Sequence, residues 1–388
     1  MNDSRIGITG NFDNMRNSLD LLFKSLRLAV IYNGSRDAQG AVIRPAHNPR
    51  SEKSYQPVAE DVAQGLRNLG FRNVVTIPDD LNLAQRLRGE RIDLAWLNTA
   101  GIQGLDPAAH TPSLLELSGI PYVGHRPLNV MILDNKHIFK GICARIGVPT
   151  PDFIVWDNRW GQLKPDIDPR FQDVFQNYDG SFVVKPVNGR ASQNVLWVRD
   201  RAGLPQAISD VHRKTLNLVQ IEKYIEGPEY CVSVCGPTIA RNGRLEQIDQ
   251  PFAFSILERV LGPDEKIFTS MDVRAITSDR VRLLRADEDS AYRELETLAR
   301  RVYCELQLRT LIRLDVRADS EGRLHVIEAN PKPDLKRPAG TMISLACAGL
   351  AQHGMTYEDL LLSLLVDTLS NHGERIPDTL GPDWQTVP

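Results

Sequence analysis

The strongest chemical signal in the sequence is a pair of short segments near the C-terminus. Residues 312–317 read IRLDVR, and residues 324–330 read LHVIEAN. Both segments alternate in polarity as strands do, and the turn-like run DSEG at 319–322 lies between them. The pattern predicts a β-hairpin whose charged side chains gather on one face.

The two acidic side chains of this hairpin are expected on the same face. A two-residue turn at 321–322 places Asp315 directly opposite Glu328, and a four-residue turn moves the pairing by two without changing the face. Arg313 shares the face of Asp315, and Asn330 shares that of Glu328. Paired carboxylates repel unless a cation lies between them, and an oxygen-only ligand set suits Mg²⁺. The alternative is a surface hairpin with ordinary salt bridges.

Two lysines stand where phosphate groups could bind. Lys185 ends an apolar strand and precedes the polar loop 188–192, whose backbone amides could fold over a phosphate. Lys136 opens a helix predicted over 134–146, where free amides and the helix dipole favour an anion. A plain hairpin and an ordinary helix start are the alternatives.

Carboxylates and thiols lie in the segment between the lysines and the hairpin. Glu222 ends a predicted strand and Glu229 follows a bend, so they could bind an adenine amino group and ribose hydroxyls. Solvated surface glutamates are the alternative. Cys231 and Cys235 lie on a strand and are expected to fill core.

The first part of the chain reads as alternating strands and helices, which predicts a mostly parallel α/β domain. Ligands in such sheets bind beyond the carboxyl ends of the strands, here 33–35 and 98–101. The connection 33–57 is long, so it is functional or mobile. Strands are predicted at 28–32, 73–77, 92–97, within 182–199, 219–224 and 229–234, and helices at 58–69, 81–88, 290–306 and 357–369. Helical spacing of Met15, Leu19 and Leu22 predicts a further helix within 1–26.

Length and charge narrow the class of protein. A chain of 388 residues holds two to three domains, at about 150 residues each. Its net charge of −3 gives no general attraction to nucleic acid or an anionic membrane. Five cysteines, an odd number, do not predict a disulfide framework. With no signal-like start and no long apolar run, a cytoplasmic protein is expected.

The ordered set of motifs resembles the ATP-grasp superfamily, and most closely the D-alanine–D-alanine ligase-like carboxylate–amine ligases. The resemblance covers roughly residues 27–369. The motifs that carry it are SGIPYVG at 118–124, DNK at 134–136, VVKP at 183–186, IEKYIEGPEY at 221–230, RLD at 313–315, IEAN at 327–330 and GMTYEDL at 354–360.

The resemblance implies a three-domain ATP-grasp fold of the α/β class, α+β in its C-terminal part. After an N-terminal extension, 1–26, it places a parallel α/β domain at 27–126. A central subdomain at 127–224 and a C-terminal domain at 225–388 would grip ATP between them.

The resemblance also implies roles for individual residues. ATP would be bound by Lys136, Lys185, Ser192, Glu222, Lys223, Ile225, Glu229 and, by a looser match, Lys266. Two Mg²⁺ ions, with Mn²⁺ as an alternative, would be held by Asp315, Glu328 and Asn330. Arg313 matches the arginine that steadies an acyl phosphate, and Ser344–Leu345 matches a pair that binds the second substrate. Arg313 and Ser344 are therefore the predicted catalytic residues.

The substrate half departs from the cell-wall enzymes of that family. The glutamate-containing run expected soon after the first strand is missing, and a different loop begins at Asn98, which is predicted to bind substrate. After the last metal ligand, 331–338 reads PKPDLKRP, and Ala191 stands where the phosphate-covering loop usually has a serine. Lys332, Lys336 and Arg337 in this segment could bind a substrate carboxylate or phosphate, and a solvated basic loop is the alternative.

The predicted function is therefore an ATP-dependent ligase that joins a small carboxylate to an amine in a specialised, natural-product pathway. It would form an acyl phosphate and release ADP and phosphate. The alternatives are a D-alanine–D-alanine ligase with atypical loops, an intramolecular cyclase, and a catalytically silent nucleotide-binding scaffold. The expected partners are small molecules, with neither nucleic acid nor membrane, and a homodimer is left open.

Overall fold

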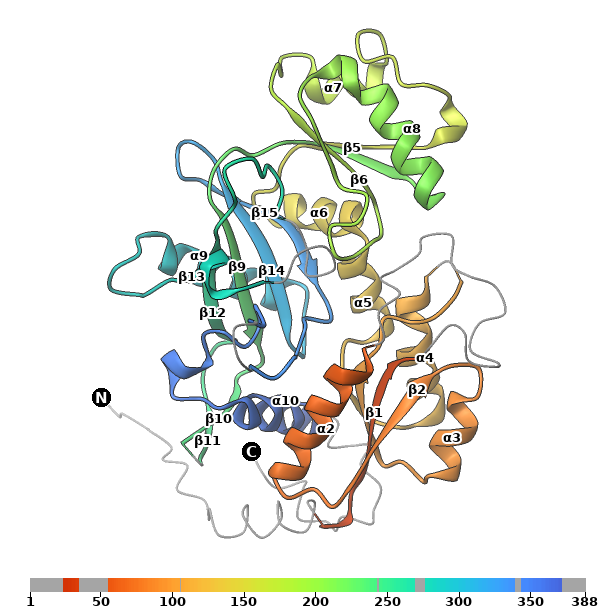
Figure 1. The fold of residues 1–388 in the computed structure, drawn as a ribbon, viewed down its shortest axis with the longest axis vertical. Helices are drawn as coiled ribbons and strands as arrows, with labels where there is room; N and C mark the ends of the chain where they lie inside the picture. The colour runs from red at the N-terminus through yellow and green to blue at the C-terminus, as the bar shows by residue number, and fades with distance from the viewer. Residues whose placement is uncertain are drawn as a thin grey trace, which may run out of the picture.

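The computed structural model describes residues 24–34, 55–104, 106–242, 244–268, 276–338 and 343–371. Most of the helix expected within 1–26 and of the 33–57 connection lies outside these ranges. Among the described helices, none has the length and apolar character needed to cross a bilayer. The described residues form three larger sheets and one two-stranded sheet, joined by helices (Figure 1).

The first sheet is parallel, as the alternating pattern predicted. Its strand order is β2-β1-β3-β4. The run Leu28–Ile31 is wholly buried because helices cover the sheet, which explains its continuous apolar character. The elements are β1 (Arg27–Asn33), α2 (Gln56–Asn68), β2 (Asn73–Asp79), α3 (Leu83–Gly89), β3 (Leu94–Asn98), α4 (His110–Ser118) and β4 (Tyr122–Val123).

The second sheet is antiparallel, with strand order β5-β8-β6-β7. The predicted strands within 182–199 and at 219–224 are confirmed, whereas β5 and two helices were not anticipated. One of these helices, α8, buries Leu204, Ile208 and Val211 at helical spacing against the sheet. The elements are β5 (Phe153–Trp156), α7 (Pro169–Phe175), β6 (Phe182–Pro186), β7 (Leu196–Val198), α8 (Leu204–Thr215) and β8 (Val219–Lys223).

The third sheet is also antiparallel and has the order β13-β12-β9-β14-β15. Its central strand β9 is buried along its whole length, including Cys231 and Cys235, as expected. Helix α9 packs on β9 and β12, and α5 and α6 pack on β15. The elements are α5 (Pro127–Asp134), α6 (Lys136–Arg145), β9 (Glu229–Cys235), β12 (Phe252–Arg259), β13 (Val281–Leu283), α9 (Ala291–Glu305), β14 (Ile312–Ala318) and β15 (Leu324–Asn330).

The hairpin β14–β15 pairs Asp315 with Glu328, but not through a two-residue turn. Ala318 pairs with Leu324, so the connection is longer, and that register alone would place Ile327 opposite Asp315. A bulge follows, because Val316 pairs with Val326 while Asp315 pairs with Glu328. The extra residue, Ile327, restores the expected pairing.

The last helix closes the core of the first sheet. Helix α10 (Tyr357–Asn371) packs beside α2, and both contribute to one apolar cluster with β1 and β3. Gly65 of α2 permits the approach, since a Cβ there would lie 2.5 Å from Leu361 Cδ1. A small sheet of β10 (Thr238–Arg241) and β11 (Arg244–Gln247) packs against α10 through β10.

Two glycines with left-handed backbone, both in the first domain, allow the cost of backbone strain to be separated from that of a steric clash. Gly101 has φ +77°, and a Cβ would lie 1.8 Å from the Pro107 carbonyl oxygen, whereas Gly119 has φ +69° and open space. We expect Gly119→Ala to lower the thermal midpoint by about 2–4 °C, the effect of about 1 kcal/mol of backbone strain. Gly101→Ala should lower it by at least about twice as much, because the clash adds to the strain. Equal shifts in a thermal melt would contradict this.

Candidate active site

A pocket lies between the second and third sheets. Its walls come from β6 and β8 on one side and from β9, β12, β14 and β15 on the other, with the β6–β7 loop across it. Most residues that the sequence assigned to ATP or metal line this pocket: Lys136, Lys185, Ser192, Glu222, Lys223, Ile225, Glu229, Asp315 and Glu328.

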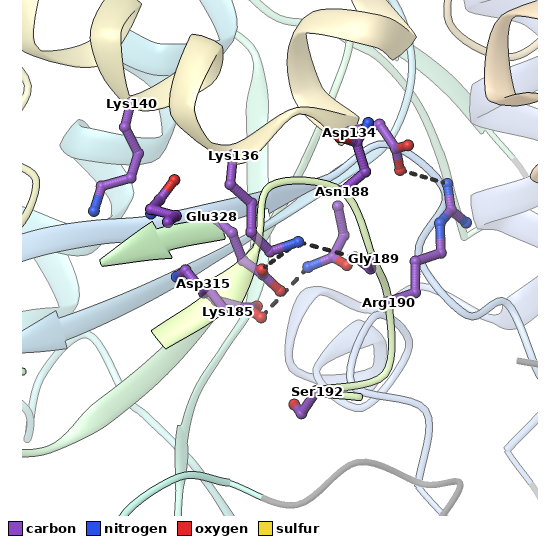
Figure 2. Close-up of polar contacts among 12 residues, drawn as sticks. Asp134, Lys136, Lys140, Lys185, Asn188, Gly189, Arg190, Ser192, Asp315 and Glu328 are labelled. Atoms are coloured by element: carbon purple, nitrogen blue, oxygen red, sulfur yellow. Dashed lines mark hydrogen bonds and ion pairs between the residues drawn. The ribbon is translucent and has the colours of Figure 1, made fainter. Parts of the chain in front are cut away.

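Lys136 links the β6–β7 loop to the carboxylate hairpin (Figure 2). It is the first residue of α6, and the preceding Asn135 side chain caps the helix. The Lys136 Nζ donates to the Gly189 carbonyl oxygen at 2.9 Å and lies 3.3 Å from Glu328 Oε2. A cation at the start of the helix therefore faces the pocket between the loop and a carboxylate.

The β6–β7 loop is held across the pocket by contacts on both sides. Arg190 Nη2 lies 3.4 Å from Asp134 Oδ1, and the Ser192 hydroxyl donates to the Phe268 carbonyl oxygen at 3.3 Å. Ala191 and Ser192 have φ values of +60° and +50°, which non-glycine residues rarely adopt. Such local strain is typical of functional loops.

A buried charge cluster forms the floor of the pocket beneath the second sheet. Glu222 Oε1 lies 2.5 Å from Lys185 Nζ, and Glu222 Oε2 lies 2.5 Å from Lys140 Nζ. Gln220 Nε2 donates to the same Oε2 at 2.7 Å. All four side chains are almost fully removed from water. Sequence reasoning missed Lys140, because an i, i+4 spacing from Lys136 on a helix carries no chemical signal by itself.

The protonation states in this cluster follow from burial and charge. Burial opposes ionisation of Glu222, but Lys140 and Lys185 outweigh it and hold its pKa at about 2. Burial lowers the pKa of Lys140 to about 8, against the opposing pull of Glu222. At neutral pH Glu222 is therefore ionised and Lys140 is mostly protonated, so the two form a buried ion pair.

A second charge cluster surrounds Asp315. Arg313 Nε lies 2.9 Å from Asp315 Oδ1, and Arg259 Nη2 lies 3.0 Å from Oδ2. Burial opposes ionisation here too, but Arg259 and Arg313 hold the pKa of Asp315 well below its usual range. The Asn330 side chain is 3.4 Å from Oδ2, and the Cys231 thiol donates to Oδ1 at 3.3 Å. The predicted convergence beside Arg313 is therefore confirmed as geometry.

The oxygen atoms at this position suit Mg²⁺. Asp315 and Glu328 line the pocket from paired positions, and the Asn330 amide adjoins them. Carboxylate and amide oxygens with access to solvent are the donors that Mg²⁺ prefers. Over the described ranges, no three His, Cys, Asp or Glu side chains form a metal-binding group by themselves. A metal here would complete its shell with the amide, water or substrate oxygens.

The residues predicted to bind substrate have other contacts. Asn98 ends β3 and donates to the Tyr55 carbonyl oxygen at 3.1 Å. Lys332 Nζ lies 3.6 Å from the centre of the Tyr55 ring. Arg337 is ion-paired with Glu358 at 2.7 Å, so its charge joins the 331–338 segment to α10.

Four more predicted residues lie away from the pocket lining. The Ser344 hydroxyl donates to the Asp334 carbonyl oxygen at 2.6 Å, and Leu345 is buried in an apolar cluster. The backbone N–H of Lys336 donates to the Asp334 carboxylate. The Lys266 side chain is half exposed, with Nζ 4.0 Å from Glu226, and it is not among the residues that line the pocket.

Solved structures share this architecture. The fold superimposes on a crystal structure of D-alanine–D-alanine ligase from Bacillus anthracis complexed with ATP, with a TM-score of 0.62 and 22% identity. The match covers 90% of this chain and 99% of that one. A parallel α/β unit followed by two antiparallel sheets beside a charged pocket is the ATP-grasp fold.

Sequence comparison gives the family. A family model described as D-ala D-ala ligase C-terminus matches residues 142–366, more than half of the chain, and the chain belongs to this family. It is 26% identical over 367 residues to a D-alanine–D-alanine ligase from Pseudomonas entomophila, covering 94% of this chain and 100% of the relative. It is also 29% identical over 338 residues to the uncharacterized protein y4sG from Sinorhizobium fredii, covering 84% and 93%.

The floor cluster predicts an order of stability among variants. Glu222→Gln leaves two buried ammonium groups without their carboxylate, which should cost about 3–5 kcal/mol. Lys140→Met should cost less, because the Lys185–Glu222 pair survives. The double variant Lys140→Met/Glu222→Gln should have a higher thermal midpoint than Glu222→Gln alone, because it buries one unpaired cation fewer. The order of thermal midpoints is measured in melts without nucleotide. The control is Glu226→Gln, because Glu226 is exposed. A Glu222→Gln midpoint at or above that of Lys140→Met would refute the assignment.

Proposed function

We propose that this chain is an ATP-dependent carboxylate–amine ligase that forms an amide bond through an acyl phosphate. Its membership in the D-ala D-ala ligase family supports ATP-dependent ligation. The observation that carries the mechanism is the convergence of Lys136, Lys185 and the Asp315–Glu328 pair on one pocket. In this proposal the nucleotide lies between residues 127–224 and residues 225–388.

The pocket offers matching groups for each part of a nucleotide. Glu222 and the 223–225 segment would bind adenine, and Glu229 the ribose. Lys136, Lys185 and the backbone of the 189–192 loop would bind the phosphates. Asp315, Glu328 and Asn330 would hold Mg²⁺. When bound, the metal supplies a Lewis acid that neutralises charge on phosphate oxygens.

The chemistry then needs positioning more than a protein nucleophile. The substrate carboxylate attacks the γ-phosphorus of ATP, the bond to the β-phosphate bridging oxygen breaks, and ADP leaves. An amine then attacks the acyl phosphate carbon, loses a proton, and expels inorganic phosphate to leave an amide. Arg313 would stabilise the oxyanion of the tetrahedral intermediate, and its contact with Asp315 fixes its orientation.

We further propose that the substrates differ from a pair of D-alanines and belong to a specialised, natural-product pathway. The segment 331–338 that follows the metal ligands supports this, because its sequence departs from the family and it packs against Tyr55 and α10. A D-alanine–D-alanine ligase with atypical loops remains the second candidate, because the relative from Pseudomonas entomophila carries that name.

An ATP-consumption screen tests the reaction. The protein is mixed with Mg²⁺, ATP and crossed pairs of D- and L-amino acids, dicarboxylates and small amines, and ADP, phosphate and new amide are measured. We expect one pair to release ADP and phosphate together. Glu328→Gln should lower its turnover at least about 100-fold, because charge neutralisation at the phosphates is lost.

The control is Glu321→Gln, an exposed carboxylate in the turn of the same hairpin, which should leave turnover unchanged. Release of AMP and pyrophosphate would contradict the acyl-phosphate mechanism. Activity with D-alanine alone would favour the second candidate. ATP binding without turnover by any pair would favour a nucleotide-binding scaffold.

A further inference from the structure

Arg259 brings a buried positive charge to the pocket between two of its acidic residues. It is the last residue of β12 and pairs across the sheet with Glu229. Its Nη1 lies 2.5 Å from Glu229 Oε1, and its Nη2 lies 3.0 Å from Asp315 Oδ2. The guanidinium therefore joins the carboxylate assigned to ribose to the carboxylate assigned to metal.

The bridge uses only part of the hydrogen-bonding capacity of the guanidinium. Arg259 lines the pocket and is 9% exposed, yet its Nε–H has no acceptor among the described residues. Buried donors in native proteins are nearly always paired, so an unpaired donor on a side chain that lines a pocket points to a ligand acceptor. A phosphate oxygen is the acceptor that guanidinium groups match best.

The position of Arg259 is fixed by aromatic stacking. Its guanidinium lies 5.0 Å from the centre of the Phe268 ring, and Arg280 lies 4.3 Å from the same ring. Arg280 is also buried, but it pairs with Glu265 at 2.8 Å and does not line the pocket. Phe268 thus contacts two arginines, and only Arg259 faces the nucleotide position.

We propose that Arg259 is a catalytic residue that contacts the triphosphate of ATP. The inference rests on the proposed function. Because its guanidinium spans from the ribose carboxylate to the metal carboxylate, it stands beside the chain of phosphates that must connect them. A permanently charged group there offsets the negative charge that gathers on the β-phosphate as the γ-phosphoryl group leaves.

A nucleotide ladder tests this contact directly. Binding of adenosine, AMP, ADP and the non-hydrolysable analogue AMP-PNP is measured by calorimetry in wild type, Arg259→Met, Arg259→Lys and Arg280→Met. For Arg259→Met we expect adenosine affinity within about twofold of wild type and AMP-PNP affinity lowered at least about tenfold, since charge-assisted hydrogen bonds to phosphate are strong. Arg259→Lys should lie between, and Arg280→Met should match wild type for every ligand.

Repeating the ladder in EDTA separates direct contact from an effect through metal. The tenfold loss for AMP-PNP should persist there. Its disappearance in EDTA would overturn the proposal, as would an equal loss for adenosine, which would show that Arg259 only positions Glu229. An unchanged AMP-PNP affinity would overturn it as well.

Two further outcomes are distinguishable. Should Arg259→Met fail to fold, Arg259→Lys decides, because the proposal still requires selective loss of phosphate-bearing ligands. Wild-type protein that binds neither ADP nor AMP-PNP would overturn the proposed function itself, whatever the variants do.

Discussion

Burying a charge away from water is costly unless an opposite charge lies within hydrogen-bonding distance, and this constraint organises the pocket. Each buried carboxylate in it is shared by two cations: Glu222 by Lys140 and Lys185, Asp315 by Arg259 and Arg313, and Glu229 by Arg259 and Arg317. Arg259 serves two of them, so five cations adjoin these three carboxylates. The excess creates a positive site within a protein whose net charge is −3.

Each charge cluster is centred on one of the two antiparallel sheets. Lys185 and Glu222 come from neighbouring strands of the second sheet, and Lys140 reaches them from α6. Asp315 and Arg259 belong to the third sheet, where β9 lies between their strands. Helix α6 packs on β15 and also carries Lys136 to the loop of the second sheet. Helix α6 therefore contacts both walls of the pocket.

Features that depend on local periodicity could be predicted from the sequence. Alternation predicted the β14–β15 hairpin and the shared face of Asp315 and Glu328, and the parallel first sheet followed from alternating strands and helices. Local patterns could not reveal partners distant in sequence. Lys140 meets Glu222 across 82 residues, and Arg259 meets Asp315 across 56. The bulge at Ile327 could not be predicted either. It offsets the longer turn, so Asp315 still pairs with Glu328.

The packing of α10 against α2 has a consequence for how the chain folds. Asn68 of α2 donates to Glu358 of α10 across 290 residues, and both helices share the apolar core of the first sheet. The first sheet is made before the other two, but the helix that covers this core follows them in the sequence. The native packing of this face of the first sheet must therefore wait for α10, so it forms late despite the early place of its strands in the sequence.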